Sequence, residues 1–292
     1  MTFSPTSRKY INAAAPVLFV LLWSTGFIGA KMGMPHAEPF TFLGTRFSMA
    51  SAVFVILLIV MRVPWPRNPI IWIHAATVGV LMHGVYLSGV FFAVYHGTSA
   101  GISALIVSVQ PILTAIFAGL LLNERLSAKA WAGLLLGFIG VSLVVWRQAG
   151  DSGGWTGISA CIASLIGITI ATLYQKRFAT GIDLRVGSAI QFAAAAALMW
   201  VMAFATETMV IDWTGEAIFA MAWLVIVLSF GAVTILYILI RQGAASKVAS
   251  LFYLVPPVVA VEGYILFSET LSPAALLGMA IAVIGVALVT RG

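Results

Sequence analysis

Residues 100–144 read AGISALIVSVQPILTAIFAGLLLNERLSAKAWAGLLLGFIGVSLV, and residues 245–289 read ASKVASLFYLVPPVVAVEGYILFSETLSPAALLGMAIAVIGVALV. The two segments align without a gap at an offset of 145 residues, and 15 of their 45 positions are identical. Roughly four identities are expected by chance at this composition, so the alignment indicates an internal duplication. Because 145 residues are almost half of the 292-residue chain, the sequence predicts two equivalent halves, residues 1–147 and 148–292. The matched positions include informative residue types: Pro111 with Pro256, Glu124 with Glu269, Gly133 with Gly278, and Gly140 with Gly285.

The composition predicts an all-α polytopic membrane protein. Hydrophobic residues make up 62% of the chain and charged residues 8%, which leaves too little polar surface to cover a water-soluble protein. Apolar runs of about 20 residues, long enough to cross about 30 Å of hydrocarbon as a helix, recur with short connections. We therefore expect ten membrane-spanning helices, approximately at residues 11–30, 40–61, 70–95, 99–122, 128–146, 155–174, 186–205, 217–240, 248–267 and 272–290.

The distribution of charge predicts the orientation of these spans. If the N-terminus is cytoplasmic, twelve of the fifteen Lys and Arg residues fall on the inner side, and the loop with Glu207, Asp212 and Glu216 is acidic on the outer side. By the positive-inside rule, both termini are expected in the cytoplasm. Five spans per half is an odd number, so the second half enters the membrane from the opposite side and the repeat is inverted. Inverted repeats occur mainly in transporters and channels, with the substrate site near the midplane between the halves.

Three motifs give the chain a resemblance to a known family. Residues 23–27 read WSTGF, and two spans that contain a proline end in NERLS at 123–127 and SETLS at 268–272. The chain resembles the EamA-type branch of the drug/metabolite transporter superfamily, and within it the YddG-type exporters of amino acids, including aromatic ones. The resemblance implies ten spans in two five-span repeats, a multi-pass protein of the cell (inner) membrane, and export of small metabolites from the cytoplasm without ATP hydrolysis.

Prolines lie near the middle of the fourth and ninth spans at positions related by the repeat. Pro111 and Pro256 each remove the backbone hydrogen bond to the carbonyl four residues earlier, at Val107 and Phe252, and Pro257 does the same one residue later. We expect these prolines to act as paired hinges or to expose carbonyls to the substrate cavity. The alternative is a static kink whose carbonyls are satisfied by neighbouring helices.

Three ionisable residues lie inside predicted spans, where charge is costly and a functional role is the first hypothesis. His83 lies near the centre of the third span, whereas Arg46 and Glu262 lie within two turns of outer span ends, so both are also able to reach the interface by snorkelling. Either residue is a candidate for substrate charge or proton coupling. Neither is repeated in the other half, because Arg46 aligns with Gln191 and Glu262 with Phe117.

An amino acid needs a counter-charge or oriented dipoles at each end and an apolar wall for its side chain. Aromatic side chains with polar tips are suited to such a wall, although packing between helices explains any single tyrosine somewhat better than ligand contact does. Trp23 and Ser24 belong to the family-like motif of the first span. The candidate substrate-binding residues are Trp23, Ser24, His83, Tyr86, Tyr237 and Tyr253.

Small residues and serines predict structural roles at the ends of the two halves. Gly133, Gly137 and Gly140 in the fifth span, and Gly278 and Gly285 in the tenth, form small-residue faces that let backbones approach closely. We expect the fifth and tenth spans to pack on each other across the axis of the repeat. Two serines that follow the acidic turns are expected to cap the helices after them, Ser127 and Ser272.

Other functions fit the sequence less well. A membrane enzyme would need a nucleophile or metal constellation, but the four histidines lie at different depths without metalloenzyme spacing, and no phosphate-binding loop is present. We therefore predict no catalytic residues, no metal and no cofactor. The basic residues flank helices, so the expected partners are the bilayer and a small-molecule substrate rather than nucleic acid, and the protein is expected to be a monomer. A multidrug or lipophilic-cation efflux carrier and a channel are the alternatives.

Overall fold

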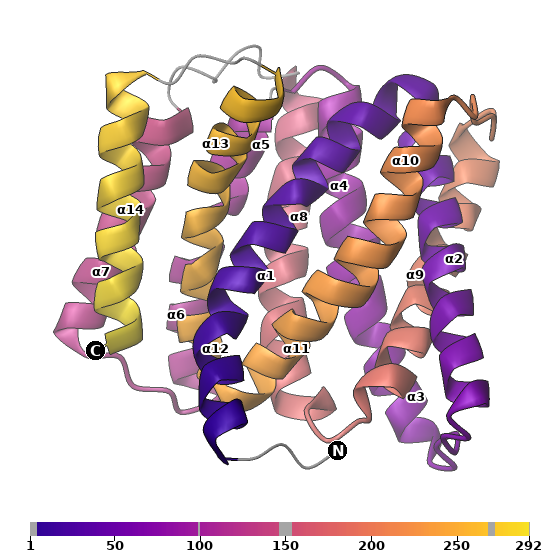
Figure 1. Ribbon diagram of the computed structural model, residues 1–292, viewed down its shortest axis with the longest axis horizontal. Helices are drawn as coiled ribbons and strands as arrows, with labels where there is room; N and C mark the ends of the chain where they lie inside the picture. The colour runs from indigo at the N-terminus through magenta and orange to yellow at the C-terminus, as the bar shows by residue number, and fades with distance from the viewer. Residues whose placement is uncertain (1–4, 99, 146–153, 268–271, 292) are drawn as a thin grey trace.

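The computed structural model describes residues 5–98, 100–145, 154–267 and 272–291, and this part of the chain is almost entirely helical (Figure 1). Ten helices within it are long and apolar enough to cross a membrane, which confirms the predicted number. The first half contains α1 (Pro5–Gly33), η1 (Met34–His36), α2 (Pro39–Val60), α3 (Pro69–Gly79), η2 (Val80–Leu87), α4 (Ser88–Tyr95), α5 (Ala100–Val107), α6 (Gln110–Leu121) and α7 (Ala128–Val145). The second half contains α8 (Gly154–Tyr174), η3 (Gln175–Ala179), α9 (Leu184–Thr206), α10 (Gly215–Trp223), η4 (Leu224–Ala232), α11 (Val233–Gln242), α12 (Ala245–Ser250), η5 (Leu251–Leu254), α13 (Val255–Phe267) and α14 (Pro273–Arg291).

Six of the ten candidate spans within the described residues contain more than one helical segment. The third and eighth spans pass through the π-helical segments η2 and η4. At the 145-residue offset Val80–Leu87 corresponds to residues 225–232, so the two π-helical segments occupy equivalent places in the two halves. Hydropathy does not predict them, since a π-helical turn changes backbone hydrogen bonding and leaves the apolar pattern almost intact.

Local side-chain bonds begin several helices where the sequence predicts. The Ser127 hydroxyl accepts the backbone N–H of Ala130 at 3.1 Å, and the Ser272 hydroxyl accepts that of Ala275 at 3.1 Å. Both caps satisfy backbone donors that have no partner within their own helix. The two predicted caps are therefore confirmed at equivalent ends of α7 and α14.

Helices α7 and α14 pack together at one edge of the bundle (Figure 1). The contact is backbone against backbone, because a Cβ atom added to Gly133 would lie 2.6 Å from the carbonyl oxygen of Gly285. A Cβ atom added to Gly140 would lie 2.6 Å from the carbonyl oxygen of Gly278. Since Gly133 and Gly278 are equivalent in the repeat, as are Gly140 and Gly285, the contact is symmetric and confirms the predicted pairing of the fifth and tenth spans.

Helices α2 and α9 form the corresponding pair at the opposite edge (Figure 1). The rings of Phe47 and Phe192, which are equivalent residues, lie 6.0 Å apart between their centroids. The Trp200 indole nitrogen donates to the hydroxyl of Ser48 at 3.0 Å across the same interface. Contact between equivalent residues places Phe47 and Phe192 close to the twofold axis of the repeat.

The remaining contacts follow the same symmetry. Helix α1 packs on α13, and the equivalent α8 packs on α6; likewise α1 contacts η4 and α8 contacts η2. The two five-helix repeats are thus inverted with respect to each other. The start of α1 and the end of α14 lie at the same end of the bundle, which we call the terminal end (Figure 1).

Two charged side chains hold the turn between α11 and α12 at the terminal end. The Glu124 carboxylate accepts the backbone N–H groups of Ala245 at 2.7 Å and Ser246 at 3.2 Å, and so caps α12. The Lys176 ammonium donates to the carbonyls of Ile240 at 2.9 Å and Gly243 at 2.6 Å, at the end of α11. The negative carboxylate faces the positive N-terminal end of α12, and the positive ammonium faces the negative C-terminal end of α11, so both charges stabilise the helix dipoles. The acidic turn at Glu124 is structural, as expected, whereas Glu269 lies outside the described residues.

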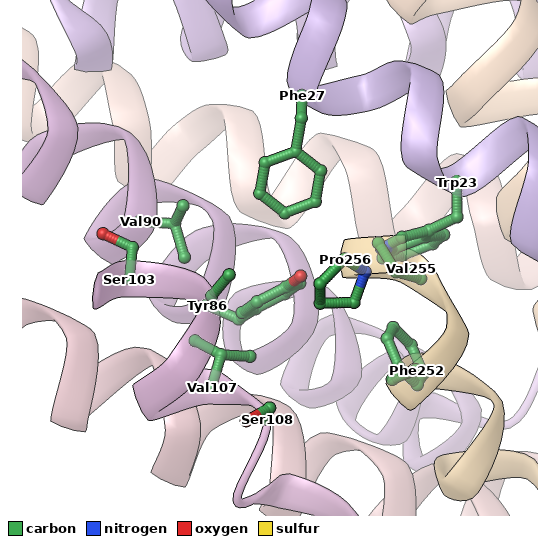
Figure 2. Close-up of a pocket in the computed structure, with 11 residues that line it drawn as sticks. Trp23, Phe27, Tyr86, Val90, Ser103, Val107, Ser108, Phe252, Val255 and Pro256 are labelled. Carbon is green, nitrogen blue, oxygen red and sulfur yellow. The ribbon is translucent and has the colours of Figure 1, made fainter. Parts of the chain in front are cut away.

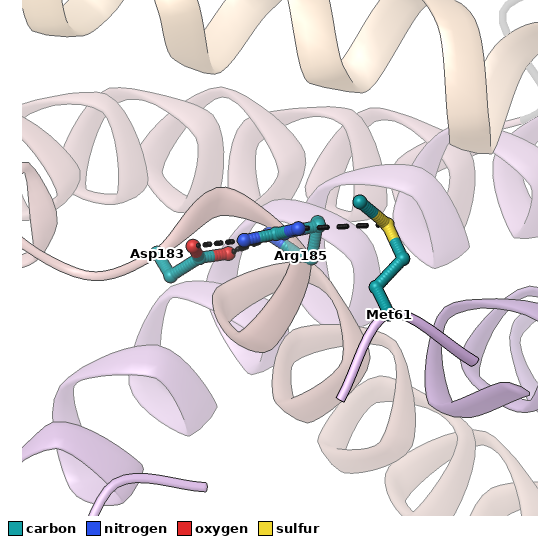
Figure 3. A network of polar contacts seen from close by, with 3 residues as sticks. All are labelled: Met61, Asp183 and Arg185. Atoms are coloured by element: carbon teal, nitrogen blue, oxygen red, sulfur yellow. Dashed lines mark hydrogen bonds and ion pairs between the residues drawn. The ribbon is translucent and has the colours of Figure 1, made fainter. Parts of the chain in front are cut away.

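A second charged contact fastens α9 to the end of α2 (Figure 3). The Asp183 carboxylate accepts the backbone N–H of Arg185 at 2.9 Å and its guanidinium at 2.8 Å, and Arg185 also reaches the sulfur of Met61 at 3.5 Å. The side-chain hydrogen bond from Arg185 holds the pKa of Asp183 below its usual range. The stabilisation by this cap is therefore complete above the ordinary carboxyl pKa, about 4, and is lost as the pH falls through the lower folded-state pKa.

We expect Gly285→Ala to loosen the pairing of α7 and α14. The new methyl carbon would lie 2.5 Å from the backbone nitrogen of Gly137, so one helix must shift. Such overpacking typically costs about 1–3 kcal/mol. Thermal unfolding of the purified protein in detergent should show a clear loss of stability. Gly119→Ala is the control, because its nearest neighbour would be the Glu124 carbonyl oxygen at 3.4 Å; equal melting temperatures for both variants would contradict the assigned contact.

Candidate functional site

A cavity lies among the first, third, fourth and ninth spans (Figure 2). Its lining residues belong to α1, η2, α4, α5, η5 and α13, with Ser108 just after α5. The cavity thus lies between elements of both repeats, as the inverted repeat predicts. Its lining residues are Trp23, Phe27, Tyr86, Val90, Ser103, Ala104, Val107, Ser108, Phe252, Val255 and Pro256.

The cavity is small in this conformation. Its volume is about 30 Å³, which is space for a few water molecules, whereas sites for drug-sized ligands typically measure about 300–1,000 Å³. An amino acid therefore requires the surrounding helices to move apart.

An aromatic cluster forms one wall of the cavity. The ring centroids of Phe19 and Trp23 lie 5.3 Å apart, and the Phe252 ring meets Phe19 at 5.3 Å and Trp23 at 5.4 Å, both edge to face. Edge-to-face aromatic pairs stabilise packing by more than the burial of their apolar surface alone would give. Because Phe252 belongs to η5, directly before Pro256, the wall joins the first span to the interrupted part of the ninth.

The fourth and ninth spans are both interrupted next to their prolines. Pro111 is the second residue of α6, which starts after a break at Ser108 and Val109, and Pro256 is the second residue of α13. Proline is favourable in the first turn of a helix, where its missing N–H leaves no bond unmade. The expected depth of the prolines is confirmed. The expectation of a freed carbonyl at Phe252 is wrong, because that carbonyl accepts the N–H of Val255 in the 3-10 turn.

Arg46 is the largest fully buried side chain and is only 1% exposed. Its one hydrogen bond runs from Nη2 to the Ser229 hydroxyl at 3.3 Å, while Nε and Nη1 are buried without a partner. The guanidinium lies within electrostatic reach of Tyr86 and His83, and no carboxylate of the described residues pairs with it. Burial excludes the snorkelling alternative for Arg46. Arginine stays charged in proteins, and this cation has a ring as its neighbour, with Cζ 5.5 Å from the centroid of Phe47, but no anionic partner among the described residues.

Both π-helical segments contribute residues near this cation. His83 and Tyr86 lie in η2, and Ser229 lies in η4. Tyr86 also lines the cavity, with its hydroxyl directed toward Pro256 (Figure 2). A π-helical turn inside an α-helix frequently marks a functional site. Tyr86 therefore lines the cavity from the π-helical segment that also contains His83, whereas Arg46 does not line the cavity.

His83 and Tyr237 form a buried pair close to the twofold axis. The Tyr237 hydroxyl lies 3.2 Å from His83 Nε2, and the His83 ring stacks on Phe192 with centroids 4.4 Å apart. His83 Nδ1 is buried without a partner. Both residues lie behind the cavity wall in this conformation, because neither lines the cavity.

Ser24 and Glu262 are bonded to each other between α1 and α13. The Ser24 hydroxyl lies 2.7 Å from Glu262 Oε1, and the other carboxylate oxygen is buried without a partner. The pair connects the first span to the ninth one residue away from the cavity-lining Trp23. A shared proton or a substrate ammonium would satisfy the free oxygen.

The other predicted site residues serve the packing around the cavity. Tyr253 is fully buried with an unpartnered hydroxyl, and its ring covers Gly137 of α7. Pro257 is also buried, in the first turn of α13. Three predicted residues line the cavity directly: Trp23, Tyr86 and Pro256.

Several cavity residues were not singled out from the sequence. Phe27 lies four residues after Trp23 and therefore on the same face of α1, so the WSTGF motif itself contains the signal. Ser103, Ser108 and Val90 carry no distinguishing pattern. Among the described residues, no group of three or more His, Cys, Asp or Glu side chains is placed to hold a metal ion.

Comparison with known proteins agrees with this architecture. A solved crystal structure superimposes with a TM-score of 0.80 over 95% of this chain and 96% of that chain, at 21% identity, and shows the same fold. YvbV, an uncharacterised transporter of Bacillus subtilis, is 26% identical over 290 residues, which cover 96% of this chain and 92% of that protein.

Two shorter matches have functional names. A protein of Salmonella typhimurium named as a probable amino-acid metabolite efflux pump is 24% identical over 59% of this chain and 54% of its own length. An Escherichia coli protein with the same name is 26% identical over 48% of this chain and 44% of its own length. The sequence profile of the EamA-like transporter family matches twice, at residues 12–146 and 155–291. The chain is a multi-pass membrane protein and belongs to the EamA-like transporter family, within the drug/metabolite transporter superfamily.

Proposed function

We propose that this transporter exports amino acids, including aromatic ones, and related carboxylate-bearing metabolites from the cytoplasm. The observation that carries the proposal is Arg46, a buried cation with two unpartnered N–H groups beside the cavity-lining Tyr86. A substrate carboxylate supplies the missing charge and accepts both hydrogen bonds in the paired geometry that guanidinium groups favour. Binding thereby relieves part of the cost of burying this cation.

The other candidate residues complete the recognition of an amino acid. The aromatic wall of Trp23 and Phe252 receives the substrate side chain, and the free oxygen of Glu262 accepts its ammonium or a coupling proton. His83 and Tyr237 support η2 behind Tyr86. The relatives named as efflux pumps for amino-acid metabolites agree with this substrate class.

Alternating access between two inverted repeats is the proposed mechanism. The two moving units are residues 1–147 and 148–292, with both termini in the cytoplasm of a bacterial cell (inner) membrane. Support comes from the narrow central cavity, which must widen to admit substrate, and from the equivalent π-helical and proline segments beside it. Exchanging the conformations of the two repeats would close one entrance while opening the other. We propose that the carrier works as a monomer.

Lipophilic-cation efflux is the second candidate, because aromatic walls also bind cations by cation–π contact. The positive charge of Arg46 within reach of Tyr86 opposes a cation in this cavity. A channel would carry unitary currents rather than saturable exchange.

The decisive experiment is counterflow in proteoliposomes with labelled amino acids, with and without an imposed pH gradient. Saturable exchange of amino acids is expected. A faster rate of transport with the pH gradient would indicate proton coupling. Equal rates with and without the gradient would indicate facilitated transport. Failure of every amino acid together with transport of a lipophilic cation would contradict the proposal, as would unitary currents in planar bilayers.

Arg46→Gln is expected to weaken transport of amino acids selectively. Loss of charge-assisted hydrogen bonds worth about 1.5–3 kcal/mol should raise the apparent KM by roughly 10- to 100-fold, and Arg46→Lys should restore part of the affinity. The control substrate is the decarboxylated amine of the same amino acid. Its transport should be weak and should not change in Arg46→Gln. Equal effects of Arg46→Gln on the acid and the amine would exclude carboxylate recognition.

Replacing Pro111 and Pro256 together by Ala tests the hinge hypothesis. Restored N–H groups favour continuous helices through both interruptions, so turnover should fall about tenfold, which corresponds to about 1.4 kcal/mol of barrier. Substrate affinity should change little. Pro69→Ala, at the start of α3 and outside the interrupted spans, is the matched control. Unchanged kinetics of the double variant would leave the prolines with a static role.

A further inference from the structure

A groove far larger than the central cavity opens between α6 and α8. Its volume is about 770 Å³, and its walls are almost wholly apolar. Leu120 is 73% exposed at its rim, and Ile166 and Ile170 are about half exposed along α8. These helices cross the hydrophobic part of the bundle, so the open side of the groove faces lipid acyl chains. Its length runs along the membrane normal from mid-bilayer toward the terminal end.

The groove ends in a basic and aromatic cluster at the terminal end. Arg177 Nη1 donates to the Leu121 carbonyl at 2.9 Å, which carries the guanidinium across the mouth from η3 to the end of α6. The Tyr174 hydroxyl, also at this end, is bonded to His74 Nδ1 at 2.8 Å. The His74 ring stacks on Phe178 with centroids 5.2 Å apart. Arg177 itself is exposed, so most of its donors are free for a ligand.

The acidic side chain closest in sequence to this mouth is already engaged. Glu124 is bonded to Ala245 and Ser246 at the start of α12. Arg125, four residues after Leu121, is exposed. The local charge available to a ligand is therefore positive, which complements an anionic group.

The equivalent positions of the other repeat have different chemistry. At the 145-residue offset Arg177 corresponds to Met32 and Tyr174 to Gly29, so the basic and aromatic end is not repeated. Phe117 and Thr169 of the groove correspond to Glu262 and Ser24, which are bonded to each other. The basic groove therefore occurs only toward the terminal end, in one leaflet of the membrane.

We propose that this groove binds one anionic phospholipid. An acyl chain lies along the apolar wall between α6 and α8, and the phosphate is held by Arg177, with Tyr174 beside it. An acyl chain matches the apolar lining of a groove that opens into the bilayer. Basic pockets between membrane helices on the cytoplasmic side bind anionic headgroups in this way.

The test is lipid retention by the purified full-length protein. Delipidated protein in detergent is titrated with phosphatidylglycerol or with phosphatidylcholine of the same acyl chains, and bound lipids are counted by native mass spectrometry. One phosphatidylglycerol should bind more tightly than phosphatidylcholine. Arg177→Gln should weaken this binding about fivefold, and Arg177→Lys should retain most of it. Ile170→Trp should reduce binding of both lipids by filling the groove.

Arg67→Gln is the matched control, since Arg67 is an exposed arginine of the α2–α3 loop, outside the groove. Equal phosphatidylglycerol affinity for wild type, Arg177→Gln and Ile170→Trp would overturn the proposal. It would also be overturned if phosphatidylcholine bound as tightly, or if glycerol phosphate without acyl chains bound as well as the lipid. A dimer that forms in detergent and is abolished by Ile170→Trp would assign the groove to a second copy of the chain instead.

Discussion

Within hydrocarbon, apolar side chains gain nothing by leaving lipid for another helix, so the fold depends on close backbone contact. The pairing of α7 and α14 shows this most directly. Gly133 meets Gly285, and Gly140 meets Gly278, at distances that leave no room for a single methyl group. These four glycines form two symmetric contacts and hold the inverted repeats together at one edge, while α2 and α9 do so at the other. The central cavity lies between these edges.

The helical scaffold obeys the symmetry of the repeat, whereas the residues of the candidate sites do not. Helix pairs, glycines, π-helical segments and interrupted spans repeat in both halves, as the proposed exchange of conformations between the two repeats requires. The charged groups on which the two hypotheses rest do not repeat. Arg46 aligns with Gln191, which is buried and bonded to Gln175, and Arg177 aligns with Met32. The substrate hypothesis and the lipid hypothesis both rest on positions where the symmetry is broken.

The candidate site was predictable only in part. Trp23 was identified from a motif, and Phe27 was identifiable from the same motif by its helical spacing. Arg46 is identifiable from the sequence as an intramembrane charge, but its place within two turns of a span end is equally compatible with snorkelling to the interface. Its burial depends on η4 packing over α2, and no local pattern reports how two distant spans rotate toward each other. Ser103 and Val90 carry no signal at all, because cavity lining depends on the rotation of each helix about its own axis.

The sequence by itself determined the ten spans, the duplication, the inversion and the family, since hydropathy, charge bias and the 145-residue offset are properties of a linear chain. It also determined the helix caps and the position of the prolines, because these act within one or two turns. The tertiary structure alone decided which polar groups meet: Arg46 with Ser229, His83 with Tyr237, and Ser24 with Glu262. These pairs join residues more than 150 positions apart, and their geometry depends on the packing angles of whole helices rather than on any segment of sequence.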